Sequence, residues 1–127
     1  MINNKKEISD PALLLFNKIQ ECMQLHKLFF HPDLNRKKLA DFLNTNEVYI
    51  ADAIRDGAGC TFSEYISALR LKNAICLIND YPEMSIADII IDSGYGSYSQ
   101  FFRSFTKKYA ICPSEYRRLL NKKINNL

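Results

Sequence analysis

The spacing of apolar residues along the 127-residue chain is helical, and no segment shows the strict alternation of a strand. Between residues 11 and 26 the apolar side chains recur every three or four positions and include Ala12, Phe16, Ile19 and Met23. Pro11 directly follows Asp10, which is typical of a helix start. The pattern predicts an all-α protein of about seven helices, preceded by a flexible segment over residues 1–9.

Two later segments repeat one arrangement, in which a short helix, a tight turn and a second helix follow one another. The first covers about residues 35–60 and the second about residues 85–110. Ser85 and Ser97 each stand three residues before an acidic or amide side chain, which is the capping-box pattern of a helix start. The repeated arrangement is the helix-turn-helix, present twice.

A long linker helix is predicted between these segments, over about residues 61–79. Its capping box is formed by Thr61 and Glu64, and its apolar stripe changes sides along its length. One face gathers Phe62, Tyr65, Ile66 and Leu69, and a roughly opposite face gathers Leu71, Ala74, Ile75 and Ile78. We interpret this helix as a link between two small cores. A last helix is predicted from Ser114 to about Leu120, and a basic tail follows over residues 121–127.

Charge is distributed unevenly along the chain. Residues 97–127 carry seven Lys and Arg against one Glu, whereas residues 61–96 carry two against five acids. A basic last quarter indicates an anionic partner, with nucleic acid first and an acidic membrane surface second. Since no apolar stretch approaches the length of a membrane span, we expect a soluble, cytoplasmic protein with no membrane partner.

The residues that carry metal or catalytic chemistry are sparse. The four cysteines form no C-x-x-C pair, and His26 and His31 complete no zinc spacing. We therefore expect reduced, mostly buried thiols, no metal and no cofactor. The chain has no nucleophile elbow, phosphate-binding loop or HExxH motif, so an enzyme is not expected.

The predicted helix over about residues 97–109 has two different sides. Aromatic residues occupy about 100° of its circumference, a width suited to packing on the preceding helix. They are Phe101, Phe105 and Tyr109, with Tyr98 and Phe102 at the edge. The opposite side carries Ser99, Gln100, Arg103, Thr106 and Lys107. This polar side is either a solvated surface or a binding surface.

Its place in the second helix of a helix-turn-helix favours a binding surface, because that helix enters the DNA major groove. Arg103 can hold guanine through two hydrogen bonds, and glutamine or serine can read other bases. Phosphates suit Lys107, Lys108 and the helix N-termini at Ser85, Ser97 and Ser114. The predicted partner is double-stranded DNA.

A longer pattern in the second half of the chain resembles the signature of the AraC/XylS family of bacterial transcription regulators. It consists of Ile86-x-x-Ile89, Gly94-Tyr95, Ser97, Phe101, Arg103, Phe105 and Pro113-Ser114-Glu115-Tyr116-Arg117. The first half is similar to the same domain at Leu39-Ala40, Tyr49, Gly59, Phe62, Tyr65-Ile66 and Arg70. The chain departs from the family at Ile90 and Ala110, where a small Ala and a Gly are common.

The resemblance implies a DNA-binding domain over residues 10–120, whose two recognition helices enter adjacent major-groove segments on one DNA face. In the second unit it assigns the bases to Tyr98, Ser99, Phe102 and Arg103, with Thr106 and Lys107 beside them. The phosphate contacts are expected at Ser97, Lys108, Ser114 and Arg117. In the first unit the corresponding residues are Val48, Ala51 and Asp52, with Glu47 and Arg55 alongside.

The first recognition helix is acidic where the family carries basic or amide side chains. We therefore expect the second unit to dominate DNA binding. The alternative is that the first unit binds a protein partner such as RNA polymerase, through Glu47, Asp52 and Asp56.

The family couples this domain to a sensor or dimerisation domain, and we favour a fragment of a longer regulator over a naturally short one. Two units in one chain make a monomer sufficient for DNA binding. A dimer would then form through the missing domain.

Overall fold

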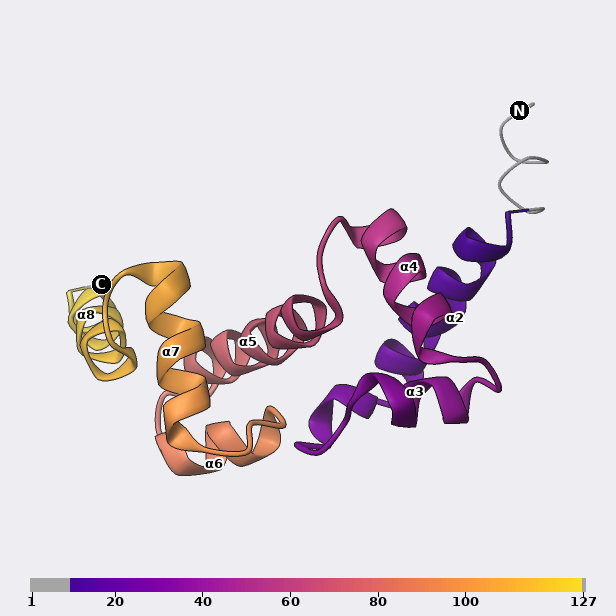
Figure 1. Cartoon of the computed structure of the whole chain (residues 1–127). Helices are drawn as coiled ribbons and strands as arrows, with labels where there is room; N and C mark the ends of the chain where they lie inside the picture. Colours follow the sequence, from indigo (N-terminus) through magenta and orange to yellow (C-terminus); the bar gives the residue numbers. More distant parts are fainter. Residues whose placement is uncertain (1–9, 127) are drawn as a thin grey trace. The chain divides into compact units, whose positions relative to one another are not determined.

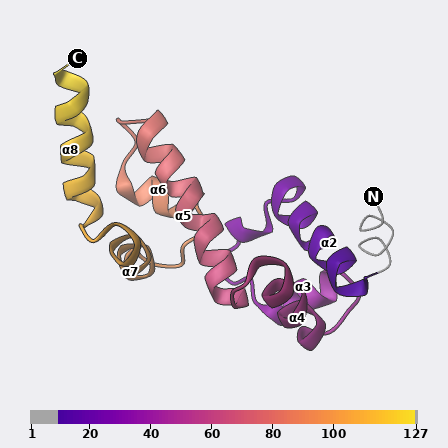
Figure 2. The same cartoon turned by 90° about the horizontal axis from the view of Figure 1, so that it is seen from above.

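A computed structural model of the chain describes residues 10–126, so the segment expected to be flexible, residues 1–9, lies outside the described residues. Residues 10–126 form seven α-helices, a single 3-10 turn and no strand (Figures 1 and 2). This confirms the predicted all-α class. The chain divides into two compact units: the first reaches Ile66 and the second begins at Ser67, except that Phe30–Pro32 belong to the second.

The first unit is built from α2 (Pro11–Leu25), α3 (Arg36–Phe42) and α4 (Glu47–Ala58), and a 3-10 turn, η1 (Leu28–Phe30), follows α2. The Asp10 carboxylate accepts a hydrogen bond from the N–H of Ala12 and caps α2. Both α2 and α3 pack against α4. The buried apolar residues of these helices are Phe16, Ile19, Cys22, Met23, Leu39, Ala40, Ile50, Ala53 and Ile54.

Gly57 lies inside α4 and does not end this helix. A Cβ at Gly57 would lie 2.3 Å from Cδ2 of Phe16, so the missing side chain is what lets α2 and α4 approach closely. The helix ends instead at Gly59, which has a φ of 71° and whose N–H donates to the carbonyl of Arg55.

The long helix α5 (Phe62–Asp80) lies where the sequence predicts a linker. Its capping box is complete, because the N–H of Glu64 donates to Thr61 Oγ1 and the N–H of Thr61 donates to Glu64 Oε1, each at 3.1 Å. Ile66 is buried in the first unit, and Leu71, Ala74 and Ile78 are buried in the second. The apolar stripe changes sides because one helix contributes to two cores.

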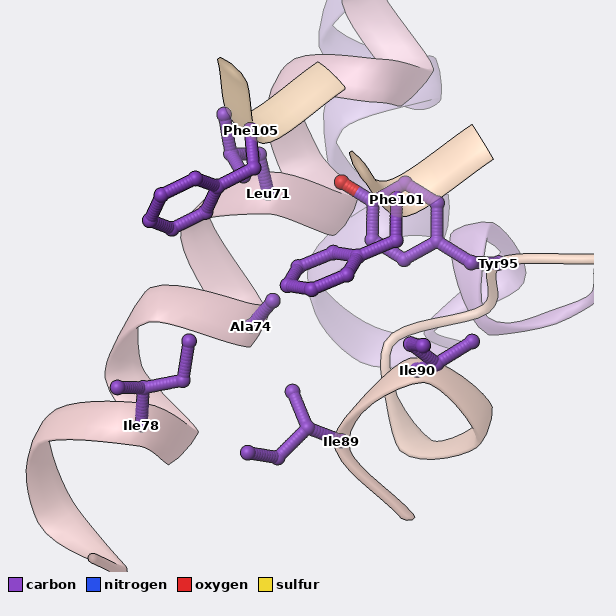
Figure 3. Packing of buried hydrophobic residues seen from close by; sticks show 8 residues of the cluster. All are labelled: Leu71, Ala74, Ile78, Ile89, Ile90, Tyr95, Phe101 and Phe105. Atoms are coloured by element: carbon purple, nitrogen blue, oxygen red, sulfur yellow. The ribbon is translucent and has the colours of Figure 1, made fainter. Parts of the chain in front are cut away.

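The second unit adds α6 (Ile86–Asp92), α7 (Tyr98–Tyr109) and α8 (Pro113–Asn125) to the remainder of α5. Figure 3 shows its core gathered between α5, α6 and α7. The core consists of Leu71, Ala74, Ile78, Ile89, Ile90, Tyr95, Phe101 and Phe105. The last helix continues five residues beyond its expected end at Leu120, to Asn125, and therefore carries Lys122 and Lys123, which were expected in a tail.

Candidate nucleic-acid interface

The turns that precede α4 and α7 have the same backbone. Each contains a residue with a left-handed conformation, Asn44 with a φ of 55° and Gly94 with a φ of 86°. The N–H of the next residue, Thr45 or Tyr95, donates to a carbonyl five residues earlier, at 2.9 and 3.1 Å respectively. This is the Schellman arrangement, and it ends α3 and α6 alike.

The two second helices also begin and end in the same way. The Asn46 side chain accepts from a backbone N–H at the start of α4, and the Ser97 side chain does so at the start of α7. Both helices end at a left-handed residue, Gly59 and Ala110. Since these landmarks are 51 residues apart (46 to 97 and 59 to 110), residues of α4 and α7 that differ by 51 occupy equivalent positions.

Core packing decides which face of α7 meets the solvent. Phe101 and Phe105 are fully buried, so the opposite side of the helix is turned outward. Arg103 and Lys107 are exposed there, whereas Lys108, seven residues after Phe101, is exposed at the last turn of the helix. None of the three has a hydrogen-bond or ion-pair partner among residues 10–126. The helix contains no acidic residue. Three cations are thus available to an anionic ligand on one helix.

Several polar side chains of α7 already have partners within the protein. Gln100 Oε1 accepts from the N–H of Gly96 at 3.0 Å, and Thr106 Oγ1 donates to a carbonyl of its own helix at 2.6 Å. The Ser104 hydroxyl lies 3.0 Å from Ser67 Oγ and 3.3 Å from the Tyr95 hydroxyl, inside the second unit. Among the expected base-reading residues, Tyr98, Ser99 and Arg103 have polar groups without a hydrogen-bond partner in residues 10–126.

The one cation of α4, Arg55, is paired with two acids of its own helix. Arg55 Nη2 lies 2.8 Å from Asp52 Oδ1, and Arg55 Nε lies 3.7 Å from Asp56 Oδ1. Glu47 Oε1 lies 3.9 Å from Arg36 Nε of the preceding helix. The cation of α4 is therefore shared between two carboxylates, in contrast to the unpaired cations of α7.

Equivalent positions on the two helices carry opposite charges. By the offset of 51 residues, Asp52 corresponds to Arg103 and Asp56 to Lys107. Val48 and Tyr49 are exposed on α4, while Ala51 is half-buried. Beside them lies a hollow of about 450 Å³, lined by Asp10, Pro11, Ala12, Leu15, Tyr49, Asp52 and Asp56.

The N-terminus of α8 differs from the other helix starts. Cys112 occupies the N-cap position but makes no capping hydrogen bond, so the first-turn amides lack a side-chain acceptor there. The Ser114 hydroxyl lies 3.3 Å from Cys112 Sγ, and this hydrogen bond lowers the pKa of the Cys112 thiol.

The structure does not support Arg117 as a phosphate contact. Its Nη2 donates to the carbonyl of Met84 and, at 3.4 Å, to that of Tyr81, in the loop between α5 and α6. Arg117 Nε is buried without a hydrogen-bond partner. The guanidinium therefore holds this loop against α8 instead of facing outward.

The expectation of mostly buried cysteines was wrong, because only Cys22 is buried. Cys60 and Cys112 are half-buried, Cys76 is exposed, and all four are free thiols. Residues 10–126 contain no group of three or more His, Cys, Asp or Glu side chains placed to hold a metal ion. No helix in this part of the chain is long and apolar enough to cross a membrane.

Comparison with known proteins assigns the chain to a class. A family model described as a helix-turn-helix domain matches residues 39–119. An uncharacterised regulator of the helix-turn-helix type from Staphylococcus aureus strain MSSA476 is 24% identical over 109 residues. This match covers 86% of the present chain and 14% of the relative. The regulatory protein YesN of Bacillus subtilis strain 168 is 31% identical over 90 residues, 69% of this chain and 24% of YesN.

Solved structures show the same fold. The C-terminal domain of AraT, a response regulator from Geobacillus stearothermophilus, has a TM-score of 0.75 and 27% identity, covering 87% of this chain and 86% of that domain. The C-terminal domain of YesN from Fusobacterium nucleatum has a TM-score of 0.69 at 21% identity, with coverage of 85% and 99%. The fold and the matches define a transcription-regulator domain, which is not an enzyme class. The chain belongs to the AraC-type helix-turn-helix family.

Proposed function

We propose that residues 10–120 form a domain that binds double-stranded DNA sequence-specifically, with α7 as the dominant recognition helix. Its first helix-turn-helix covers about residues 35–60, the linker 61–79 and the second helix-turn-helix 85–110. The observation that carries the proposal is the exposed surface of α7, where Arg103 and Lys107 lie on the outer face and Lys108 on the last turn, with no acid on the helix and no partner among residues 10–126. Such a face on the second helix of this motif suits the major groove.

The residues of α7 divide into base-reading and phosphate-binding groups. Arg103 is placed to donate two hydrogen bonds to guanine O6 and N7, and Ser99 to contact a neighbouring base. Tyr98, Phe102, Thr106 and Lys107 extend the same face. Ser97, Lys108 and the N-terminus of α8 with Ser114 would hold phosphates.

We infer a smaller contribution from α4, which would enter an adjacent major-groove segment on the same DNA face. Val48 and Ala51 can touch thymine methyl groups, whereas Glu47 and Asp52 disfavour nearby phosphates. Arg55 adds little, because Asp52 and Asp56 already neutralise it. Two helix-turn-helix units in one chain let a monomer bind, and a protein with this function would act in the bacterial cytoplasm.

The test is selection of bound duplexes from random DNA, followed by titration of the purified chain at several salt concentrations. We expect Arg103→Ala to relax one base position at a cost of about 1–3 kcal/mol. Lys108→Ala should weaken binding to all sequences and lower the slope of log K against log salt by about 1. Arg118→Ala is the matched control, because Arg118 is exposed but lies on α8 and pairs with Glu115 at 2.7 Å. Equal affinity for selected and random DNA would contradict the proposal of sequence-specific binding.

A second candidate function concerns the first unit alone, which would bind a protein partner such as RNA polymerase. The acidic hollow beside Tyr49, Asp52 and Asp56 favours this function. Exchanging both aspartates for asparagine separates the two cases. If α4 lies in a DNA groove, the loss of two negative charges should raise DNA affinity several-fold. If α4 faces purified RNA polymerase, binding of the polymerase should fall and DNA affinity should stay unchanged.

A further inference from the structure

We propose that Tyr98 and Phe102 form a binding site for the 5-methyl group of thymine, beside the guanine that Arg103 reads. This inference rests on the proposed DNA-binding function and adds the class of base that the start of α7 selects.

Tyr98 and Phe102 are large apolar side chains in an exposed position. Their exposed fractions are 52% and 36%, whereas Phe101 and Phe105 on the same helix are fully buried. The two outer rings pack on each other, with centroids 5.8 Å apart and planes at 34°. The pair therefore forms a preorganised, largely apolar surface that no other part of residues 10–126 covers.

The charges around the pair indicate what covers it in a complex. Arg103 follows Phe102 directly, and Lys107 and Lys108 lie further along the same helix, all without partners among the described residues. A polyanion complements this helix, while another apolar protein surface would leave three cations without counter-charges. In the major groove of DNA, the apolar group presented by the bases is the C5-methyl of thymine.

The hydrogen-bonding groups of α7 restrict which bases this helix can recognise. Arginine only donates, so Arg103 selects the two acceptors of guanine. Adenine is held best by an amide that donates and accepts at once, and Gln100 is the one amide of α7. Its oxygen accepts from the N–H of Gly96 at 3.0 Å, and this bond directs the side chain back toward the start of the helix. Beside the hydroxyl of Ser99, the start of α7 presents the rings of Tyr98 and Phe102, whose apolar surface suits contact with thymine.

The first unit lacks this surface at the equivalent positions. By the offset of 51 residues, Glu47 is equivalent to Tyr98, and Ala51 is equivalent to Phe102. The equivalent positions of α4 therefore hold no aromatic pair. Dependence on a thymine methyl through an aromatic pair should therefore belong to the half of the DNA site that α7 reads.

The experiment replaces thymine by deoxyuridine, one position at a time, in the DNA duplex selected by the chain. Uracil lacks only the 5-methyl group, and it leaves the base pairing and the charge unchanged. We expect one or two adjacent replacements to weaken binding about four-fold each, the effect of removing one buried methyl group. Phe102→Ala should abolish this sensitivity, whereas Arg103→Ala should relax the guanine position and keep the sensitivity to uracil.

Each outcome bears on a distinct claim. If selected DNA binds specifically but every deoxyuridine duplex binds as tightly as its parent, the methyl site is wrong and the DNA-binding function stands. If Phe102→Ala retains the uracil sensitivity, the site lies elsewhere on the protein. If no sequence is preferred, both proposals fall. A change in oligomeric state of Tyr98→Ala/Phe102→Ala in sedimentation, without uracil sensitivity, would assign the pair to self-association instead.

Discussion

At the scale of the residue, the first unit depends on a contact between an aromatic ring and a helix backbone. The Phe16 ring of α2 lies over Gly57 of α4, where a Cβ would come within 2.3–2.7 Å of three ring atoms. The ring also meets the edge of Tyr65, with centroids 5.9 Å apart. Because the ring is buried against neighbouring side chains, it has little room to withdraw.

We therefore expect Gly57→Ala to destabilise the protein by about 1–3 kcal/mol, although alanine is the better helix former. Urea unfolding followed by circular dichroism measures this change. Gly96→Ala is the control, since a Cβ there would meet nothing nearer than 3.5 Å. An unfolding free energy of Gly57→Ala at or above that of the parent would show that the ring can shift freely.

Tyr95 is a buried ionisable residue of the second unit. Burial raises its pKa above the usual value of 10.0, and the hydrogen bond with Ser104 and the charge of Arg70 offset part of this rise. The folded state therefore favours the neutral phenol. Its contribution to stability is complete below pH 10 and is lost as the pH rises through the higher folded-state pKa.

We predict that, as the pH rises above 10, the parent loses stability more steeply than Tyr95→Phe does. At neutral pH the variant should be less stable by about 0.5–1.5 kcal/mol, because its hydrogen bond to Ser104 is gone. Tyr81→Phe, at an exposed site, serves as the reference in the same urea titrations. Identical pH profiles for Tyr95→Phe and the parent would contradict the assigned cause.

At the scale of the element, α4 and α7 end with the same backbone conformation but with different residues. Both require a left-handed residue, and Gly59 meets this with a φ of 71°. Ala110 takes the same conformation with a φ of 62°, where its Cβ is crowded by the backbone. The end of α7 thus carries backbone strain that the end of α4 does not.

Opposite substitutions at these equivalent sites should have opposite effects. Ala110→Gly should stabilise the protein by about 1 kcal/mol, and Gly59→Ala should destabilise it by a similar amount. No atom lies within 4 Å of a Cβ built at Gly59, so the backbone conformation alone causes the loss. Thermal unfolding of both variants checks the pair, and a shift of the same sign in both would disprove the explanation.

At the scale of the whole molecule, each unit has its own core, and α5 contributes to both. Ile54 lies in the first core and Ile89 in the second, and both are fully buried. The charges divide in the same way, with paired acids on α4 and unpaired cations on α7. The two units therefore share a backbone design while their exposed faces differ.

The matched variants Ile54→Ala and Ile89→Ala test how far the cores are independent. Each should cost about 2–5 kcal/mol in its own unit. Native-state hydrogen exchange should rise mainly in α3 and α4 for the first variant and in α6 and α7 for the second. A uniform rise over both units in either variant would show a single cooperative core.

The helices and both helix-turn-helix units followed from local signals in the sequence. Proline at N1, serine and asparagine caps and the capping box at Thr61 each act within one turn, so they can be identified without knowledge of the fold. The inward faces of α4 and α7 followed from the helical spacing of Ile50, Ile54, Phe101 and Phe105. Ile90, large where the family commonly has alanine, is accommodated in the second core.

The errors concern contacts between residues far apart in the sequence. The close approach of Phe16 to Gly57, the loop carbonyls that engage Arg117 and the exposure of Cys76 depend on tertiary packing.

The sequence by itself determined the class of the protein, its helices, its two-fold repeat and the basic character of its last quarter. Short-range hydrogen bonds and helical periodicity fix these features within a few residues. Only the tertiary structure decided which side of α7 faces the solvent, because the packing of Phe101 and Phe105 in the second core fixes the orientation of the helix. That orientation leaves Ser99, Arg103 and the outer aromatic pair on the face of α7.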